Sequence, residues 1–486
     1  MSSIKDLYPQ DVWEIFYDLT QIPRPSKKES GAVEYVKKFG EKHGLKTIVD
    51  EVGNVILRKP ATPGYEDRMG VVLQAHLDMV PQKNSDTEHD FEKDPIQAVI
   101  DGEWVKASGT TLGADNGIGV AAALTIMKSD SVEHGPLEAL LTIDEETGMT
   151  GAFALKPGLL EADMLLNLDS EDEGELYIGC AGGMNTTGSF EYREEDAPAG
   201  YVSFNVEIKG LKGGHSGLDI HLGRANAIKL MNRLLWAAGE KLKVRIVSFN
   251  GGNLRNAIPR EAFAVVLVPG GKIDRFRELV SEMKDTFRNE YHGPEPDLQV
   301  SCQESEISGN VMPVEVQSRL LKMVYGIPNG VMNMIADMPD VVETSTNLAV
   351  IKAGKGEVSA LCLLRSSVDS AKFNIGNMTQ AVMELAGAEV IHDGTYPGWQ
   401  PDLDSPALRT MKKVYTDKYG KVPAIKVIHA GLECGIIGDA YPGMDLISFG
   451  PTIRFPHSPD EKVNIKTVGL FYDYLMETLK NIEKKK

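Results

Sequence analysis

The sequence predicts an α/β domain that is interrupted by a long α+β insertion. Up to about residue 185, amphipathic helical segments alternate with short apolar runs that are typical of buried strands. From about Pro198 the strand-like runs instead alternate polar and apolar residues, as in an antiparallel sheet. After a linker rich in Pro, Gly and Asp (394–406), the first pattern returns and continues to the C-terminus.

The first segment is expected to form a sheet with helices on both faces, because strands and helices alternate along it. The helical pattern of "SGAVEYVKKFGEKHG" ends at Gly44, a residue suited to closing a helix. The later elements are the strand "GVVLQA" (70–75), the buried helix "GIGVAAALTIM" (117–127), and the strands "EALLTI" (138–143) and "ADMLLNL" (162–168).

The insertion repeats one order of elements, βαββα, over roughly a hundred residues per copy. The first copy consists of "YVSFNVEIKGL" (201–211), "GRANAIKLMNRLLWAAGE" (223–240), "KVRIVSFNGG" (243–252), "EAFAVVLVP" (261–269) and "KIDRFRELVSEMKDTFRNEY" (272–291). The second consists of "DLQVSCQES" (297–305), "PVEVQSRLLKMVYGI" (313–327), the hairpin strands "STNLAVIKAG" (345–354) and "EVSALCLLRSSVD" (357–369), and "NMTQAVMELAGA" (377–388). The order repeats although the residues do not, which predicts an internally duplicated domain.

The C-terminal segment returns to the α/β pattern. Its elements are "PALRTMKKVYTDKYG" (406–420), "AIKVIHAG" (424–431), "MDLISFGP" (444–451) and the closing helix "TVGLFYDYLMETLKNI" (467–482). The predicted domains are therefore residues 1–189 and 396–486, which together form the α/β domain, and residues 190–395, which form the insertion.

Composition excludes several classes of function. The formal net charge of −19 argues against nucleic acid or an anionic membrane as a partner, since both need basic patches. The four cysteines include no C-x-x-C pair, so neither a disulfide framework nor a thiolate zinc site is indicated. The N-terminus lacks the pattern of a secretion signal, and no apolar run approaches the roughly 20 residues needed to cross a bilayer. A reducing cytoplasm is the expected location.

Side chains of the types that bind metal follow several of the predicted strands. His76 and Asp78 come after "GVVLQA", and Asp144, Glu145 and Glu146 come after "EALLTI". The other members of this set are Asp115 in "TLGADNGIGV", Asp169 after "ADMLLNL" and His457 in "GPTIRFPHSPDE". Open α/β sheets bind ligands at the carboxyl ends of their strands. We therefore expect these side chains to converge at one edge of the sheet.

A single His or Asp at a strand end is most often a structural hydrogen-bonding residue. Two imidazoles and four carboxylates at one edge are different, because the repulsion among the carboxylates must be offset. Two divalent cations would offset it, and in such hydrolytic sites the ions lie about 3.5 to 4 Å apart. Ligands of these types, without thiolate, suit Zn²⁺, Co²⁺ and Mn²⁺ about equally, and Zn²⁺ is the ion that we name first.

The spacing of His76 and Asp78 favours a supporting role for Asp78, because a metal-bound imidazole commonly donates its other N–H to a carboxylate. A simple turn residue is the alternative. Glu145 and Glu146 are neighbours and point in different directions. One should bind metal and the other should accept a proton from the activated water. The alternative, three acids on a solvated turn, is disfavoured by the apolar strand that leads into them.

The motifs resemble those of the M20 clan of co-catalytic metallopeptidases. They are "HLD", "GADNGIG", "DEETG", "NLDSE" and "GPTIRFPHSPDE", with "GGHSG" in the insertion. Longer stretches such as "HLDMVPQKNSDTEHDFEKDPI", "LRNAIPREAFA" and "HAGLECG" are similar to the bacterial aminoacyl-histidine (Xaa-His) dipeptidase subgroup. The resemblance covers the chain from about residue 5 to the C-terminus. It implies a zinc-peptidase-like catalytic domain with a mixed central sheet and a lid domain formed by the insertion.

Carried over position by position, the resemblance implies two divalent metal ions per chain. His76 and Asp169 are then ligands of one ion, Glu146 and His457 are ligands of the other, and Asp115 bridges both. Glu145 becomes the general base, and Asp78 orients His76. The resemblance also implies a cis peptide bond between Asp115 and Asn116.

In the insertion, the resemblance implies that His215 reaches the oxygen of the scissile carbonyl. Asn256 and Arg365 are expected to hold the backbone and terminal carboxylate of the substrate, although Arg365 could equally be an ordinary exposed strand residue. Many clan members have a "GGTD"-like loop where this chain has "HAGLECG", so a substrate contact by Glu433 is a hypothesis. Because the insertion contains two copies, we expect His215 to act on the metals of its own chain.

The expected activity is hydrolysis of short peptides that carry a free C-terminal carboxylate, Xaa-His dipeptides among them. The alternative enzyme is a deacylase of N-acyl amino acids that uses the same site. A protein that binds metal or peptide without turnover is disfavoured, because binding alone does not require Glu145. A phosphate loop is excluded, since "GADNGIG" does not match G-x-G-x-x-G. The dipeptide is the expected partner, and a homodimer is compatible with the sequence.

Overall fold

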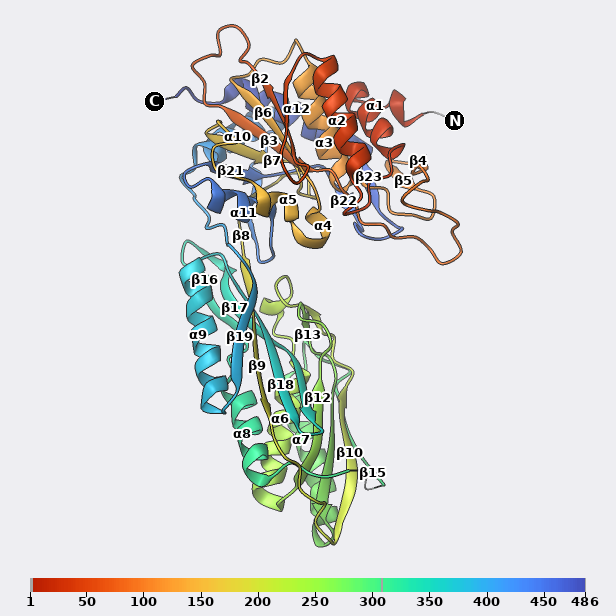
Figure 1. Cartoon of the computed structure of the whole chain (residues 1–486), viewed down its shortest axis with the longest axis vertical. Helices are drawn as coiled ribbons and strands as arrows, with labels where there is room; N and C mark the ends of the chain where they lie inside the picture. Colours follow the sequence, from red (N-terminus) through yellow and green to blue (C-terminus); the bar gives the residue numbers. More distant parts are fainter. Residues whose placement is uncertain (1–2, 307–308, 486) are drawn as a thin grey trace. The chain divides into compact units, whose positions relative to one another are not determined.

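The computed structural model describes residues 3–306 and 309–485, which form two compact units (Figure 1). The first unit consists of the chain up to Gly179, Trp399–Val427 and the segment from Leu432 onward. The second unit consists of Cys180–Gly398 and Ile428–Gly431. It begins before residue 190 because β9 (Gly182–Glu191) pairs with two later strands of this unit, β18 (Glu357–Ser366) and β19 (Glu389–Tyr396).

The first unit is built on a mixed eight-stranded sheet in the order β1-β2-β6-β3-β7-β21-β8-β20. The four central strands β6 (Leu137–Thr142), β3 (Val71–His76), β7 (Met164–Asn167) and β21 (Asp445–Ser448) are parallel. The flanking strands are β1 (Lys46–Val49), β2 (Val55–Lys59), β8 (Glu175–Cys180) and β20 (Ala424–Ile428), and β2 and β8 run antiparallel to their inner neighbours. The predicted α/β class with a mixed sheet is confirmed.

Helices cover both faces of this sheet. Neighbouring strand residues point to opposite faces, so Val71 and Leu73 of β3 join one buried cluster while Val72 joins another. The first cluster includes residues of α1 (Gln10–Thr20), α2 (Ser30–Lys42), α3 (Ala114–Lys128), α10 (Pro406–Tyr419) and α12 (Ile465–Asn481). The second includes residues of α5 (Thr150–Ala154) and α11 (Glu433–Ala440).

Short elements complete the first unit. These are η1 (Ile4–Asp6), α4 (Glu145–Gly148) and a small antiparallel sheet of β22 (Ile453–Arg454), β23 (Lys462–Asn464), β5 (Trp104–Ala107) and β4 (Ala98–Asp101). The small sheet supports the loop between β22 and β23, which carries His457.

The second unit is an antiparallel sheet with helices packed on one face. Its main path runs β15-β10-β14-β12-β17-β18-β9-β19, and β16 pairs with β17. The strands are β10 (Tyr201–Lys209), β12 (Arg245–Gly251), β14 (Ala262–Pro269), β15 (Gln299–Ser305), β16 (Gly330–Ile335) and β17 (Met338–Gly354), with a separate pair β11 (Gly214–His215) and β13 (Ala257–Ile258). One buried cluster joins the sheet to α6 (Ala227–Leu242), α7 (Ile273–Glu290), α8 (Val314–Gly326) and α9 (Asp369–Leu385). The short helices are η2 (Ile220–Leu222) and η3 (Gly270–Lys272).

The strand order differs from two tandem βαββα copies. The strand expected to open the second copy, β15, lies beside β10 instead of beside β18. β9 occupies the place beside β18, where its residues Gly182–Glu191 pair along the whole of β18. The order is symmetric about the β12–β17 pair, with β14 matching β18, β10 matching β9 and β15 matching β19. The half of the sheet that contains β17 and β18 therefore includes β9, a strand that precedes the other half in the chain.

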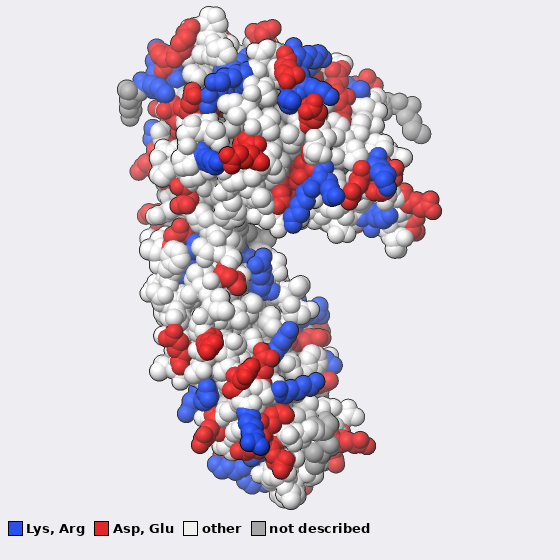
Figure 2. All heavy atoms as spheres, in the orientation of Figure 1, with Lys and Arg blue, Asp and Glu red and all other residues white. Residues whose placement is uncertain are grey.

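Among the described residues, no helix combines the length and hydropathy that a membrane span requires. On the face drawn in Figure 2, acidic and basic side chains are interspersed, and the basic ones form no continuous patch.

Candidate metal centre

Three adjacent parallel strands bring the expected ligands to one edge of the sheet in the first unit. His76 is the last residue of β3, Asp169 lies just beyond β7, and Glu145 and Glu146 open α4 just beyond β6. Since β6, β3 and β7 are neighbours and parallel, their carboxyl ends meet there. Asp115 arrives at the same place from the start of α3.

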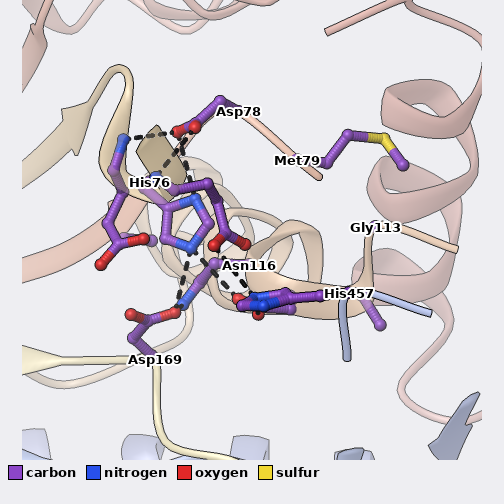
Figure 3. Close-up of polar contacts among 12 residues, drawn as sticks. His76, Asp78, Met79, Gly113, Asn116, Asp169 and His457 are labelled. Carbon is purple, nitrogen blue, oxygen red and sulfur yellow. Dashed lines mark hydrogen bonds and ion pairs between the residues drawn. The ribbon is translucent and has the colours of Figure 1, made fainter. Parts of the chain in front are cut away.

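His76 lies at the centre of the first group of ligand atoms. Its Nε2 is 3.1 Å from Asp115 Oδ1 and 3.3 Å from Asp169 Oδ1. Figure 3 shows the His76 ring between Asp78 on one side and Asp169 on the other. The side chain of Asn116 donates to Asp169 Oδ1 and to the carbonyl of Leu168, which fixes the orientation of Asp169. These three ligand atoms are close enough together to bind one ion.

His457 lies at the centre of the second group. Its Nε2 is 3.0 Å from Glu146 Oε2 and 3.3 Å from Asp115 Oδ2. Asp115 thus belongs to both groups, with one carboxylate oxygen facing each imidazole. The Asp115–Asn116 peptide bond is cis, as expected from the sequence.

Asp78 contacts His76 and the backbone of Glu145 and Glu146. Its Oδ1 lies 3.3 Å from His76 Nδ1, and its two oxygens accept hydrogen bonds from the backbone N–H groups of Glu145 (3.0 Å) and Glu146 (3.2 Å). Ser26 donates a further hydrogen bond to it. Burial alone would raise the pKa of Asp78, but the hydrogen bonds with His76 and Glu145 outweigh burial and hold that pKa at about 2. Asp78 therefore stays ionised and holds three site residues together.

The electrostatics of the cluster favour a cation. Hydrogen bonds that its ring donates to the carboxylates of Asp115 and Glu146 raise the pKa of His457 to about 11. Burial lowers the pKa of His76, yet Asp169, Asp115 and Asp78 together raise it well above its ordinary value. Burial raises the pKa of Glu145 and of Glu146. The carboxylates that stabilise positive charge on both imidazoles carry the negative charge that two divalent ions would neutralise.

The donor set fits such ions. Glu146 Oε1 is buried and accepts no hydrogen bond from any residue that the structure describes, so it has capacity for a ligand. Imidazole nitrogens and carboxylate oxygens are the ligand types of zinc and its neighbours. Glu145 belongs to a third group with His76 and Glu146, which places its carboxylate beside both sets of ligands.

In the second unit, His215 and Arg365 lie together. His215 Nδ1 accepts hydrogen bonds from the backbone N–H groups of Gly217 and Leu218, so the neutral ring carries its proton on Nε2. That nitrogen is 3.5 Å from Arg365 Nη2. Burial and the charge of Arg365 lower the pKa of His215, which favours this neutral form. Two donors therefore converge, an arrangement that suits an anionic or carbonyl oxygen.

Arg365 is only 5% exposed, which excludes the alternative of an ordinary exposed strand residue. Its guanidinium donates to the hydroxyls of Tyr396 (3.0 Å) and Ser216 (3.3 Å). Asn256 is exposed, and its carbonyl accepts a hydrogen bond from the N–H of Ser216. Asn256 is thus near the loop of His215 by a backbone contact.

Glu433 is 1% exposed at the start of α11. Its Oε2 accepts hydrogen bonds from Gln74 of β3 (2.6 Å) and Thr142 of β6 (2.9 Å). Burial raises its pKa to about 7. Both hydrogen bonds are to Oε2, whereas Oε1 is buried and accepts no hydrogen bond from any described residue. A substrate contact by Glu433 therefore stays a prediction.

The sequence did not predict two buried charged residues that lie beside the site. Arg24 donates to the carbonyls of Leu77, Asp78 and Gly113. Glu461 accepts a hydrogen bond from the backbone N–H of Asp115. The only local signal was the position of Glu461, four residues after His457 in "HSPDE". Arg24, in "IPRPS", has no pattern that distinguishes it from a surface arginine.

Comparison with known proteins gives consistent matches. The model of peptidase family M20/M25/M40 matches residues 72–481. The chain is 47% identical to the cytosol non-specific dipeptidase of Escherichia coli (strain K12), with 100% of both chains covered. The crystal structure of aminoacylhistidine dipeptidase from Vibrio alginolyticus matches with a TM-score of 0.96 and 49% identity, covering 100% of this chain and 99% of the other. The aminopeptidase PepT of Bacillus cereus has the same fold (TM-score 0.58, 15% identity, 98% and 99% covered).

Proposed function

Because the chain belongs to peptidase family M20/M25/M40, it is a metallopeptidase, and we propose that it hydrolyses a range of dipeptides with free ends, Xaa-His among them. The observation that carries this proposal is the double use of Asp115, whose two oxygens face His76 and His457, with Glu145 beside both groups. A binding protein would need the ligands but not the additional carboxylate of Glu145.

We assign His76 and Asp169 to one ion, Glu146 and His457 to the other, and Asp115 to both. When bound, the ions lower the pKa of the attacking water and polarise the scissile carbonyl. Their identity is proposed as Zn²⁺, with Co²⁺ and Mn²⁺ as alternatives that suit the same donors.

Glu145 is proposed to take the proton of the attacking water and to return it to the departing amine. The hydrogen bond from its backbone N–H to Asp78 supports this role by holding α4 in place. Burial raises the pKa of its carboxyl group well above the usual range, and a group that binds a proton readily is suited to carrying one between two steps.

His215 is proposed to donate from Nε2 to the carbonyl oxygen, and Arg365 to bind the C-terminal carboxylate of the substrate. Arginine suits that group because its planar fork donates two parallel hydrogen bonds. Tyr396 and Ser216 support the assignment, since their hydroxyls hold the guanidinium in one orientation. Asn256 remains a proposed contact for the peptide backbone of the substrate.

The proposed substrates and location rest on the relatives. The E. coli relative is named a cytosol non-specific dipeptidase, and the V. alginolyticus relative an aminoacylhistidine dipeptidase. We propose from these names a cytoplasmic enzyme with broad specificity that includes Xaa-His.

The substrate class is tested with a dipeptide panel and the matching N-acetyl dipeptides. The protein is stripped of metal and reconstituted with Zn²⁺, Co²⁺ or Mn²⁺, and kcat/KM is measured for each pair. We expect the free dipeptides to react faster, because acetylation removes a charge-assisted hydrogen bond of about 1.5 to 3 kcal/mol. That loss corresponds to roughly 10- to 150-fold in kcat/KM. Faster hydrolysis of the acetylated compounds would instead identify a deacylase.

Replacing His215 with Ala should lower kcat by about 10²- to 10³-fold, the usual effect of losing one donor to a developing oxyanion. Metal content should not change, because His215 belongs to none of the ligand groups among the described residues. His221→Ala is the matched control, since this histidine is exposed on the neighbouring η2. Equal activity of the two variants would remove His215 from the mechanism.

A further inference from the structure

Glu461 is a buried carboxylate beside the metal centre, in the loop between β22 and β23 that also carries His457. It is 2% exposed. Its Oε2 accepts hydrogen bonds from the backbone N–H groups of Leu112 (2.7 Å) and Gly113 (3.0 Å), and its Oε1 from those of Ala114 (2.7 Å) and Asp115 (3.2 Å). One carboxylate thus satisfies four successive backbone donors.

The four donors belong to the segment that presents Asp115. Gly113 adopts a left-handed conformation (φ 70°) before α3, and the backbone of Asp115 and Asn116 is not helical. The first N–H groups of a helix have no partner within it, and here they are buried, so they need an external acceptor. Glu461 supplies it.

The same residue also closes the turn after His457. The backbone N–H of Glu461 donates to the carbonyl of Ser458 (2.9 Å). This turn matters because His457 itself has a positive φ of 58° and its side chain is half exposed, so the conformation of the loop helps to set its position. Through its backbone and its side chain, Glu461 is bonded to both ligand-bearing segments.

Arg24 extends this support to β3. Its guanidinium donates to the carbonyl of Gly113 (2.5 Å) and to those of Leu77 and Asp78 (2.9 Å each). A side chain at position 113 would meet the guanidinium at 2.6 Å, so the close approach of Arg24 requires a glycine there. Burial lowers the pKa of Arg24, and the charge of Glu461 opposes that shift without a direct ion pair between the two side chains.

We propose that Glu461 is a positioning residue of the metal centre, which holds Asp115 and His457 at the separation that a shared ion requires. This inference rests on the proposed function, because it takes Asp115 and His457 as ligands. Residues that orient metal ligands typically change metal affinity by about 10- to 100-fold when they are replaced.

The test titrates Co²⁺ alone, in competition with a chromophoric chelator, into the metal-free full-length protein and its Glu461→Gln variant. A glutamine keeps the size of the side chain but turns an NH₂ group toward two of the four backbone donors, which displaces Asp115. We expect Co²⁺ binding to weaken by about 10- to 100-fold, with a changed visible absorption spectrum of the bound ion. Wild-type affinity together with a wild-type spectrum would overturn the proposal.

Glu138→Gln is the matched control. Glu138 is also buried (5% exposed) and accepts two backbone N–H groups, those of Glu161 and Ala162, but it lies at the amino end of β6, away from the ligands. Its replacement should lower thermal stability and leave Co²⁺ affinity unchanged. If both variants lose affinity equally, the effect is one of general stability and the proposal fails.

Two further variants keep the outcomes distinct. If Glu461→Gln does not fold, the same titration on Glu461→Asp decides, since Asp keeps the charge but is too short to reach all four donors. Asp115→Asn tests the underlying ligand assignment. Normal Co²⁺ binding by Asp115→Asn would refute the proposed function together with this inference, whereas weak binding by Asp115→Asn with normal binding by the Glu461 variants would refute the inference alone.

Discussion

Replacing Glu145 with Gln is expected to lower kcat by roughly 10²- to 10⁴-fold, the range that a general base contributes. The glutamine has nearly the same shape, and the backbone hydrogen bond from position 145 to Asp78 does not involve the side chain. Packing of α4 should therefore persist. What is lost is the group that accepts a proton from water. Steady-state kinetics with a free dipeptide measure the effect.

Metal analysis of the same preparation separates this role from ligation. Glu145→Gln should retain both ions at wild-type occupancy, whereas Glu146→Gln, the neighbouring control, should lose affinity because Glu146 Oε2 faces His457. Wild-type turnover by Glu145→Gln would exclude it as the base. A large loss of metal in that variant would instead show that Glu145 is a ligand.

Replacing Asp115 with Asn is expected to weaken binding of both ions, by more than the roughly 100-fold seen for residues that only orient ligands. The physical reason is that Oδ1 faces His76 and Oδ2 faces His457, and an amide nitrogen cannot replace either oxygen as a ligand. The ions bound per chain are counted after dialysis against a defined concentration of free metal. Activity should fall with occupancy.

Asp169→Asn is the comparison for this experiment. Asp169 lies in the group of His76 and Asp115 but not in that of His457. Its replacement should therefore weaken binding of the ion at His76 and largely preserve binding of the ion at His457. Two ions bound to Asp115→Asn at wild-type affinity would disprove the shared carboxylate. Loss of both ions from Asp169→Asn, equal to that from Asp115→Asn, would show that the two sites are not separable in the way proposed.

The sequence predicted the residues of the centre because their positions follow a local rule. Apolar runs mark β3, β6 and β7, and residues after the carboxyl ends of adjacent parallel strands meet. His76, Glu145, Glu146 and Asp169 could be placed in this way. Asp115 and His457 were included for their residue types and for the loops that carry them, and the assignment of each to an ion depended on motifs that resemble those of a known clan.

The supporting residues could not be found in the same way. Glu461 bonds to backbone groups about 350 residues earlier in the chain, at Leu112 to Asp115, and backbone donors leave no trace in a side-chain pattern. The contacts of Glu433 with Gln74 and Thr142, on two strands, could not be read from the sequence, and its proposed contact with a substrate stays a prediction. The burial of Glu433 depends on how α11 packs on the sheet, and this packing cannot be predicted from the residues of α11 alone.

The strand order of the second unit could not be predicted from the sequence either. Periodicity located β10, β12 and β14, but pairing depends on contacts between distant segments. The residues of β9, "GGMNTTGSFE", show no clear alternation, and this strand pairs with β18 about 175 residues later. The repeated element order did not indicate which strands pair, and β9, rather than β15, lies beside β18. The internal duplication itself stays a prediction.

The position of β21 determines the order in which the two sheets can be completed during synthesis. β21 lies between β7 and β8, so the first unit lacks an inner strand until residues 445–448 have left the ribosome. Every described strand of the second unit precedes β21 in the chain, since the last of them, β19, ends at Tyr396. Domains that are complete fold as units, and pairings across long sequence separation are slow. While the inserted unit is being made, β7 and β8 therefore lack the strand that joins them, and unpaired strand edges of this kind can pair with other chains.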